Sequence, residues 1–323
     1  MDIIITGGAG FIGSNLIRNL KERNHLIVID NRSDLDSIND HIQEIDFFNI
    51  DILDYTKMKT ICKNTDGIIH LAAVSRVIWG FENPWQCLQT NIQGTVNVLE
   101  AARKSNKKPW VIFGSSREVY GENGCLPVKE DAPYKPVNVY SVSKITAEMI
   151  CEKYHQNYGL NVGIARFSNV YGGLFDILDR VIPRFVLSSI LNEPIYFHGG
   201  NQLFDFTHIA DTVEGLTKMI VAINNAKSNY FNKYQFLTGK PSSLQNIKEI
   251  IENKLRKEID TKVIAPRSYD VVKFYGDPSK TKQELGFAAK VDIKTGIEKT
   301  IELYSQELNN NREFFESRMV WRK

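Results

Sequence analysis

The chain has 323 residues, of which 42% are hydrophobic and 24% are charged. This composition is close to that of soluble globular proteins, so it argues against wholesale disorder and fits two domains, or one large domain with an appendage. Lys and Arg number 40 against 38 Asp and Glu, with no dense basic block of the kind that tracks a phosphate backbone, so we expect no nucleic-acid partner.

The four cysteines, Cys62, Cys87, Cys125 and Cys151, lie far apart and form no Cys-x-x-Cys pair. Without clustered histidines beside them, they argue against a metal site and against a disulfide framework, and they fit a reducing cytoplasm. No apolar run reaches the roughly 18 residues of a membrane span, and the N-terminus lacks the basic and apolar regions of a signal peptide. We therefore expect a cytoplasmic protein with no membrane partner.

Short apolar runs alternate with helix-patterned segments through the first half of the chain, which is typical of a parallel sheet wound with helices. The expected strands are Asp2–Thr6, His25–Asp30, Ile45–Ile50, Gly67–Leu71, Trp110–Gly114 and Asn161–Phe167. The expected helices between them are Ile12–Lys21, Tyr55–Lys63, Leu88–Lys104 and Tyr140–Tyr158. The pattern predicts a doubly wound, Rossmann-like α/β fold, which binds ligands beyond the carboxyl ends of its strands.

Prolines and glycines interrupt this pattern after Gly173, so we expect a smaller C-terminal region that binds substrate. Its neighbourhood contains expected helices at Val181–Leu191, Ile209–Asn224, Leu244–Lys257 and Ile293–Leu308. The predicted division is a Rossmann domain over residues 1–173, which also takes back about 205–240, and a substrate-binding region over 174–204 and 241–308. Residues 309–323 form a C-terminal tail that either docks on the body or stays mobile.

A glycine-rich turn, Gly7-Gly-Ala-Gly10-Phe-Ile-Gly13, directly follows the first expected strand and begins a helix. In this context Gly7 permits a tight turn, Gly10 lets the backbone approach a pyrophosphate, and Gly13 lets the helix pack closely. The N–H groups at the start of the helix face the negative charge. The turn therefore predicts a dinucleotide site.

Asp30 ends the second expected strand about 20 residues downstream, where a carboxylate accepts hydrogen bonds from both hydroxyls of the adenosine ribose. A phosphate at that position would be repelled, so we expect NAD, although nearby Arg32 leaves NADP open. Asp51 follows the third strand, where it either hydrogen-bonds the adenine or simply caps the strand end.

Tyr140-Ser-Val-Ser-Lys144 places a phenol and an ammonium four residues apart on one face of an expected helix. A tyrosine with a pKa of about 10 is a poor base, but a nearby lysine cation and the positive charge of oxidised nicotinamide favour the phenolate. Alone, the pattern also fits a solvated helix pair. Together with the glycine turn it predicts a catalytic pair.

The chain resembles the extended short-chain dehydrogenase/reductase family, specifically its NAD-dependent nucleotide-sugar epimerases and dehydratases. The resemblance covers nearly the whole chain and includes the motifs above. It also rests on His70-Leu-Ala-Ala73, Asn91 in Thr-Asn-Ile-Gln-Gly-Thr, Ser115-Ser116-Arg-Glu-Val-Tyr120-Gly, Arg166-Phe-Ser-Asn169-Val-Tyr-Gly, Asp205-Phe-Thr-His-Ile-Ala-Asp211 and Leu285-Gly-Phe. It implies cofactor contacts at Gly7, Gly10, Phe11, Ile12, Gly13, Asp30, Asn31, Asp51, Ile52, Leu71, Ala72, Ala73, Asn91, Ser115, Tyr140 and Lys144.

The resemblance also implies a division of labour at the sugar. Tyr140 removes the proton of the 4-hydroxyl while hydride leaves C4, Ser116 hydrogen-bonds the same oxygen, and Lys144 holds the ribose and tunes Tyr140. The expected contacts to a nucleotide-diphosphate sugar are Ser116, Arg117, Asn169, Phe204 and Arg267. Arg76 follows the fourth strand at the carboxyl end of the sheet, where it either reaches the sugar or its phosphates or lies at the surface. The guanidinium fork of Arg267 suits the oxygens of a diphosphate. Phe204 lies where the family usually has arginine, and it either stacks on a base or ribose or belongs to the core.

Glu118 lies where family 4,6-dehydratases carry the glutamate that takes the C5 proton, whereas simple 4-epimerases usually have an uncharged residue. It favours a 4,6-dehydratase of a GDP-, UDP- or dTDP-linked hexose or N-acetylhexosamine, which oxidises C4, removes water across C5 and C6 and returns hydride to C6. Arg117 departs from the aspartate of deoxythymidine-linked glucose dehydratases, although dehydratases of GDP-mannose also lack it. If the strand continues past Gly114, successive side chains face opposite ways and Arg117 and Glu118 should not both enter the pocket, so we expect Arg117 to point outward and to pair with a surface acid.

Other functions stay open. They are a nucleotide-sugar 4-epimerase, a nucleotide-uronate decarboxylase in which Arg117 pairs with the carboxylate, and a non-catalytic NAD-binding protein. The family usually forms dimers through two long helices, here Leu88–Lys104 and Tyr140–Tyr158, so the resemblance implies a homodimer.

Overall fold

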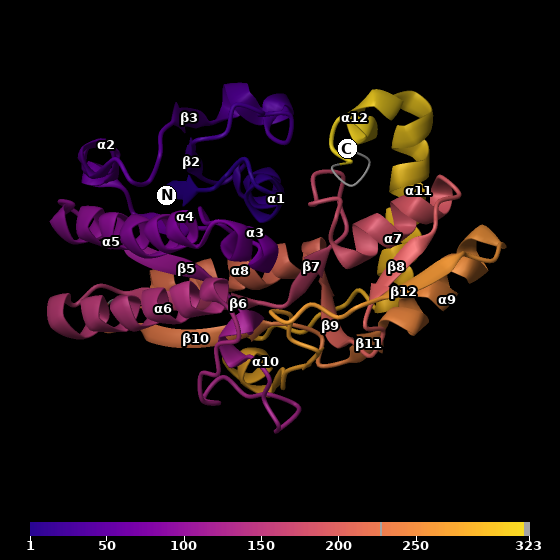
Figure 1. Ribbon diagram of the computed structural model, residues 1–323. Helices are drawn as coiled ribbons and strands as arrows, with labels where there is room; N and C mark the ends of the chain where they lie inside the picture. Colours follow the sequence, from indigo (N-terminus) through magenta and orange to yellow (C-terminus); the bar gives the residue numbers. More distant parts are fainter. Residues whose placement is uncertain (227, 320–323) are drawn as a thin grey trace.

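A seven-stranded parallel sheet lies at the centre of the computed structural model, which describes residues 1–226 and 228–319 (Figure 1). Its strands, in spatial order, are β10 (Phe231–Phe236), β6 (Val162–Phe167), β5 (Trp110–Ser116), β4 (Gly67–His70), β1 (Asp2–Thr6), β2 (His25–Asp30) and β3 (Asp46–Asn49). The chain order reverses between β1 and β4, and a crevice forms at such a switch point. The predicted doubly wound α/β fold is confirmed.

The apolar run of β1 explains why helices cover both faces of the sheet. Ile3 and Ile5 are fully buried in the core that includes residues of α1 (Phe11–Leu20) and α8 (Ile209–Asn225). Ile4 is fully buried in the opposite core, with residues of α2 (Tyr55–Ile61), α5 (Gly94–Lys104) and α6 (Val139–Tyr158). Successive side chains of a strand face opposite ways, so a strand buried on both faces needs a continuous apolar sequence.

One expectation about this part of the chain was wrong, and one strand of the sheet was not predicted. The helix expected over Leu88–Lys104 is divided into α4 (Pro84–Leu88), a π-helical turn over Gln89–Gln93, and α5. The strand β10 was not expected, because Asn232, Lys233 and Gln235 interrupt its apolar pattern. It lies at the edge of the sheet beside β6, and its buried Gln235 amide donates to the backbone oxygens of Val128 (2.8 Å) and Asp277 (3.2 Å).

The C-terminal half contributes a second group of elements with its own apolar core (Figure 1). Its strands are β7 (Asn169–Tyr171), β8 (Ile195–His198), β9 (Leu203–His208), β11 (Pro241–Ser243), β12 (Thr261–Ile264) and β13 (Lys273–Phe274). Its helices are α7 (Val181–Ile190), α9 (Leu244–Leu255) and α11 (Ile293–Asn310). The remaining helices of the described chain are α3 (Val77–Glu82), α10 (Ser279–Leu285), α12 (Arg312–Glu316) and the 3-10 turns Asn39–Glu44, Cys62–Asn64 and Arg117–Tyr120.

The described part of the C-terminal tail docks on the body. Phe315 is fully buried, and the Arg318 guanidinium donates to the backbone oxygens of Leu174 (2.7 Å) and Asp176 (3.0 Å). Residues 320–323 of the expected tail lie outside the described residues.

Within residues 1–226 and 228–319, no helix is both long and apolar enough to cross a membrane, and no cluster of His, Cys, Asp and Glu could hold a metal ion.

A buried ion pair joins α6 to the sheet. The Glu148 carboxylate accepts two hydrogen bonds from Arg166, at 2.9 and 2.6 Å, one from Ser115 at 2.5 Å and one from Tyr134 at 2.8 Å. The side chains of Glu148 and Arg166 are 0% and 1% exposed. Removing one partner of such a pair leaves an uncompensated charge in the interior.

We therefore predict that Glu148→Gln lowers the free energy of unfolding by roughly 3–5 kcal/mol, measured by urea denaturation. A matched control is Glu152→Gln on the same helix, because the Glu152–Lys233 pair is partly exposed and is expected to contribute about 1 kcal/mol or less. Equal losses for the two variants would contradict this account.

Candidate active site

A cavity of about 650 Å³ lies over the carboxyl ends of the central strands and extends to the C-terminal region. Its walls come from the segments that follow β1, β2, β3, β4 and β5, together with the end of β6 and the segment before α7. Its volume is in the range of binding sites for small ligands and cofactors. The expected cofactor, catalytic and substrate residues line it with one exception, Asn91.

The glycine turn has the backbone that a dinucleotide site needs. Gly7 has a φ of +71°, and a Cβ there would lie 2.6 Å from the backbone nitrogen of Ala72. A Cβ on Gly13 would lie 2.4 Å from the Gly7 oxygen. The N-cap of α1 is Gly10, which offers no side-chain acceptor to the first N–H groups, so these groups suit a phosphate.

Asp30 is fixed beside this turn. Its two carboxylate oxygens accept hydrogen bonds from the backbone N–H groups of Ala9 (3.0 Å) and Arg32 (3.1 Å). Burial raises the pKa of Asp30, against the lowering effect of these backbone hydrogen bonds. The Arg32 guanidinium donates to the Ala9 oxygen at 2.9 Å, and Asp51 accepts from Asn31 at 3.0 Å. The turn and the carboxylate together fit the adenosine half of NAD.

Replacement of Asp30 by asparagine should weaken the discrimination against NADP, because the charge that repels a 2′-phosphate is lost. The ratio of the NADP and NAD dissociation constants, measured by calorimetry, is expected to fall about tenfold, as for the loss of an interaction worth 1.4 kcal/mol. Asp51→Asn is the control and should leave the ratio unchanged. An unaltered ratio in the Asp30 variant would show that another residue selects the cofactor.

Asn91 lies one layer behind the wall of the cavity. Its amide exchanges two hydrogen bonds with the backbone of Val74 (2.8 and 3.1 Å) and donates to Ser143 Oγ at 2.9 Å. The amide of Asn91 thus holds the loop after β4 against α6. Asn91 does not line the cavity, so its expected direct contact with the cofactor stays a prediction. The hydroxyl of Ser115, another expected contact, is directed at Glu148.

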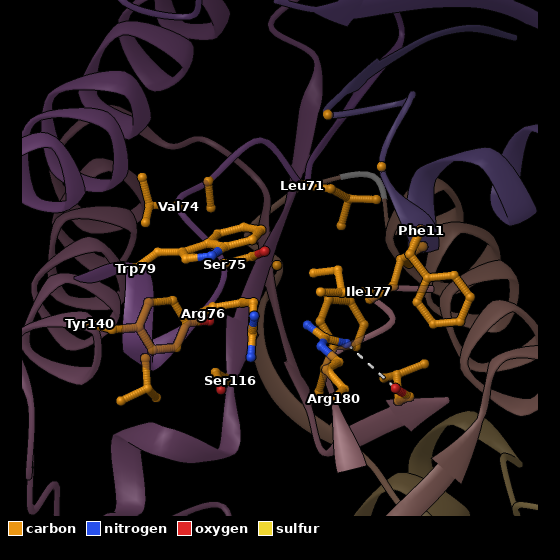
Figure 2. Close-up of a pocket in the computed structure, with 18 of the residues that line it drawn as sticks. Phe11, Leu71, Val74, Ser75, Arg76, Trp79, Ser116, Tyr140, Ile177 and Arg180 are labelled. Carbon is orange, nitrogen blue, oxygen red and sulfur yellow. Dashed lines mark hydrogen bonds between the residues drawn. The ribbon is translucent and has the colours of Figure 1, made fainter. Parts of the chain in front are cut away.

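The three residues expected to act on C4 meet in the cavity. Ser116 ends β5, and Tyr140 and Lys144 lie on the first two turns of α6. Figure 2 shows Tyr140 and Ser116 on one side of the cavity, with Arg180 across from them. A capping box between Asn138 and Ser141 fixes the start of α6 and hence the position of the phenol.

Burial is the largest influence on the pKa values of Tyr140 and Lys144. It raises the pKa of Tyr140 to about 12, although a hydrogen bond with Ser116 and the charge of Arg180 act in the opposite direction. It lowers the pKa of Lys144 to about 8. Lys144 Nζ donates to the Gly114 oxygen at 2.8 Å and lies 6.0 Å from the centroid of the Tyr140 ring. The expected acidification of the phenol by Lys144 together with oxidised nicotinamide stays a prediction, because burial dominates the pKa of Tyr140 in the protein alone.

Because Lys144 loses its proton as the pH rises through about 8, we predict that kcat/KM falls above that pH. Lys144→Arg keeps a positive charge at higher pH, so its falling limb should move upward. The measurement is the pH profile of both proteins at saturating NAD. A wild-type profile that stays flat well above pH 8 would contradict a requirement for the ammonium.

The expectation that Arg117 points outward was wrong. The strand β5 ends at Ser116, and the 3-10 turn Arg117–Tyr120 follows, so the alternation of a strand does not continue. Arg117 and Glu118 both line the cavity, and Arg117 Nη2 lies 2.9 Å from Glu118 Oε1. The guanidinium of Arg117 lies over the ring of Phe204, 4.6 Å from its centroid. Phe204 is thus both a buried residue and a wall of the cavity.

Further charged groups line the part of the cavity that is expected to bind substrate. Arg267 contacts His198 Nε2 at 3.0 Å and Asp270 at 3.9 Å, and Arg76 pairs with Asp179 across the cavity. Trp79, Asp179, Arg180 and Asp270 also line the cavity and were not predicted from the sequence. The position of Asp270, three residues after Arg267, could have indicated an ion pair, whereas no local pattern relates Arg76 to Asp179.

The known proteins that this chain resembles include nucleotide-sugar epimerases and dehydratases. Residues 4–300 match the family model described as GDP-mannose 4,6 dehydratase. A putative UDP-glucose 4-epimerase of Methanocaldococcus jannaschii is 33% identical over 314 residues, covering 96% of this chain and 99% of that protein. The structure of UDP-glucose 4-epimerase from Thermotoga maritima with UDP-glucose is similar with a TM-score of 0.88 at 28% identity, covering 95% of this chain and 100% of that one. That of the dTDP-glucose 4,6-dehydratase DesIV from Streptomyces venezuelae, with NAD bound, is similar with a TM-score of 0.88 at 25% identity, covering 97% and 100%.

The sheet, the glycine turn and the tyrosine–lysine pair define an NAD-dependent enzyme with a Rossmann-like fold. The chain belongs to the extended short-chain dehydrogenase/reductase family of nucleotide-sugar epimerases and dehydratases. The family resemblance and the NAD expectation drawn from the sequence are thereby confirmed.

Proposed function

We propose that the protein is a nucleotide-sugar 4-epimerase whose substrate is a UDP-linked hexose. The observation that carries this proposal is the engagement of Glu118, the residue on which the dehydratase expectation rested. One carboxylate oxygen pairs with Arg117 at 2.9 Å, and the other accepts from Asn138 Nδ2 at 3.3 Å. A carboxylate engaged in this way is poorly placed to take a proton from C5. The similarity to UDP-glucose 4-epimerases supports the same choice and the nucleotide.

The residues around C4 have separate tasks in this proposal. Tyr140 Oη takes the proton of the 4-hydroxyl, and Ser116 Oγ hydrogen-bonds the same oxygen and holds it beside the phenol. Bound NAD would accept a hydride from C4 and return it to the opposite face of the sugar. The positive charge of oxidised nicotinamide would also oppose the burial that keeps Tyr140 protonated. The guanidinium of Arg267, with Asn169 nearby in the same cavity, would bind the diphosphate.

Tyr140→Phe should lower kcat by about 10²–10⁴-fold, because the phenol is the proton acceptor. The dissociation constant of NAD should change little, since the ring is kept and only the hydroxyl is removed. Turnover by stopped assay and NAD binding by calorimetry measure the two effects separately. Undiminished turnover would reject the catalytic assignment.

A 4,6-dehydratase remains the second candidate, because the Glu118 carboxylate does line the cavity two residues after Ser116. Incubation with NAD and UDP-glucose in deuterated water distinguishes the two reactions. We expect UDP-galactose with no deuterium on carbon. A 4-keto-6-deoxy product, lighter by one water and carrying deuterium at C5, would instead establish the dehydratase.

We also propose that the protein forms a homodimer through the helices that follow β4 and the surface of α6. Large hydrophobic side chains are exposed there, with Trp85 78% exposed on α4 and Met149 55% exposed on α6. The helices α4 and α6 contact each other, so these exposed side chains lie on neighbouring elements, where a larger apolar surface would mark a contact site. The mass in solution, measured by light scattering, would be that of a monomer if this proposal is wrong.

A further inference from the structure

The charged pair Arg117–Glu118 is buried at the sugar end of the cavity. The side chains of Arg117 and Glu118 are 10% and 7% exposed, so the pair is largely removed from water. Asn138, which donates to the second oxygen of Glu118, also caps α6 and donates to the backbone of Tyr269 at 3.0 Å. The carboxylate is therefore held from two sides by groups that have fixed positions.

The position of the guanidinium depends on aromatic rings that flank it. It lies 4.6 Å from the centroid of Phe204 and 5.6 Å from that of Phe274, and its Nε donates to Asn169 Oδ1 at 3.4 Å. The buried Nη1 has no hydrogen-bond partner in the described structure, as expected of a guanidinium nitrogen packed against rings. A cationic side chain in place of Phe204 would repel Arg117. The two departures from the family pattern, Arg117 and Phe204, thus form one contact.

We propose that Arg117, positioned by Phe204, determines the reaction by withholding Glu118 from C5 of the oxidised sugar. If Glu118 accepted a proton it would become neutral, and Arg117 would be left as an uncompensated buried cation. Ser116, the direct neighbour of Arg117, is placed beside the C4 oxygen in our proposed function, on which this inference rests. Glu118 lies two residues after Ser116 and lines the same cavity, and C5 of the sugar is bonded to C4, so the carboxylate belongs to the segment closest to C5.

The reaction that Arg117 suppresses can be written fully. In the 4-keto sugar, the C5–H bond breaks, the proton passes to a Glu118 oxygen, and the electron pair forms an enolate on the C4 oxygen. Return of a solvent-derived deuteron from Glu118 to C5 regenerates the ketone with one deuterium in place of hydrogen. Alternatively, the electron pair of the enolate expels the C6 hydroxyl, which leaves as water with a proton from Glu118, and a C5=C6 double bond remains. The hydride taken from C4, which reduced NAD would supply, then adds to C6, and a solvent-derived proton adds to C5 to give the 4-keto-6-deoxy product.

The test uses holoenzyme with NAD and UDP-glucose in deuterated water, and reads deuterium at C5 by mass spectrometry and proton NMR. Wild type should epimerise C4 without label at C5. Arg117→Ser should incorporate at least about tenfold more deuterium at C5, or form the 4-keto-6-deoxy product, because a positioned general base contributes upward of about 10² in rate. The double variant Arg117→Ser with Glu118→Gln should lose this label, which identifies Glu118 as the base.

The outcomes separate this inference from the proposed function. If Arg117→Ser still epimerises and C5 stays unlabelled, the inference is overturned and the 4-epimerase stands. If wild type itself forms the 4-keto-6-deoxy product, the 4-epimerase proposal falls, and the restraint by Arg117 falls with it.

Two variants guard against a folding defect in Arg117→Ser. Arg117→Gln keeps much of the side-chain volume without the charge, and Phe204→Leu removes the ring face while leaving the guanidinium. Both variants should incorporate deuterium at C5. Phe204→Leu should incorporate less than Arg117→Gln, because Arg117 loses its aromatic contact there but can still pair with Glu118. Thermal melting and NAD content show whether each variant is folded, and an unlabelled C5 in folded, epimerising Arg117→Gln contradicts the proposal.

Discussion

The buried Glu148 carboxylate is the contact on which the geometry of the reaction site depends. It receives hydrogen bonds from Ser115 at the end of β5 and from Arg166 on β6 while belonging to α6 itself. Tyr140, Lys144 and Glu148 are four residues apart, so they share one face of the helix. Ser116 follows Ser115 directly. The buried Glu148–Arg166 pair therefore aligns Ser116 of β5 with Tyr140 and Lys144 of α6.

The cavity differs in character along its length. At the end expected to bind NAD, close backbone approach and one carboxylate, Asp30, would provide the binding surface. At the sugar end, arginines are each held by an acidic neighbour, as in Arg117–Glu118, Arg76–Asp179 and Arg267–Asp270. Internal partners of this kind fix the direction of each guanidinium before a ligand arrives, and preorganised charges need less rearrangement during a reaction. They also occupy carboxylates that could otherwise act as bases.

Much of this arrangement could be predicted from the sequence, because the signals are local. The bounds of β1 and β2 follow from uninterrupted apolar runs, and the glycine turn owes its meaning to the strand before it and the helix after it. Arg117 was misplaced because the prediction assumed that strand alternation continues through it, whereas β5 ends at Ser116 and a 3-10 turn over Arg117–Tyr120 follows. The contact of Arg117 with Phe204 and the pair Arg76–Asp179 join segments far apart in the chain, and only the folded structure brings them together.

In the proposed reaction the protein oxidises a nucleotide sugar at C4 and leaves the C5–H bond intact. A crystal structure of the holoenzyme with a UDP-hexose tests this claim most directly. The account predicts that the 4-oxygen lies about 3 Å from both Tyr140 Oη and Ser116 Oγ, with Glu118 still paired to Arg117. A Glu118 carboxylate released from Arg117 and directed at C5 would contradict it.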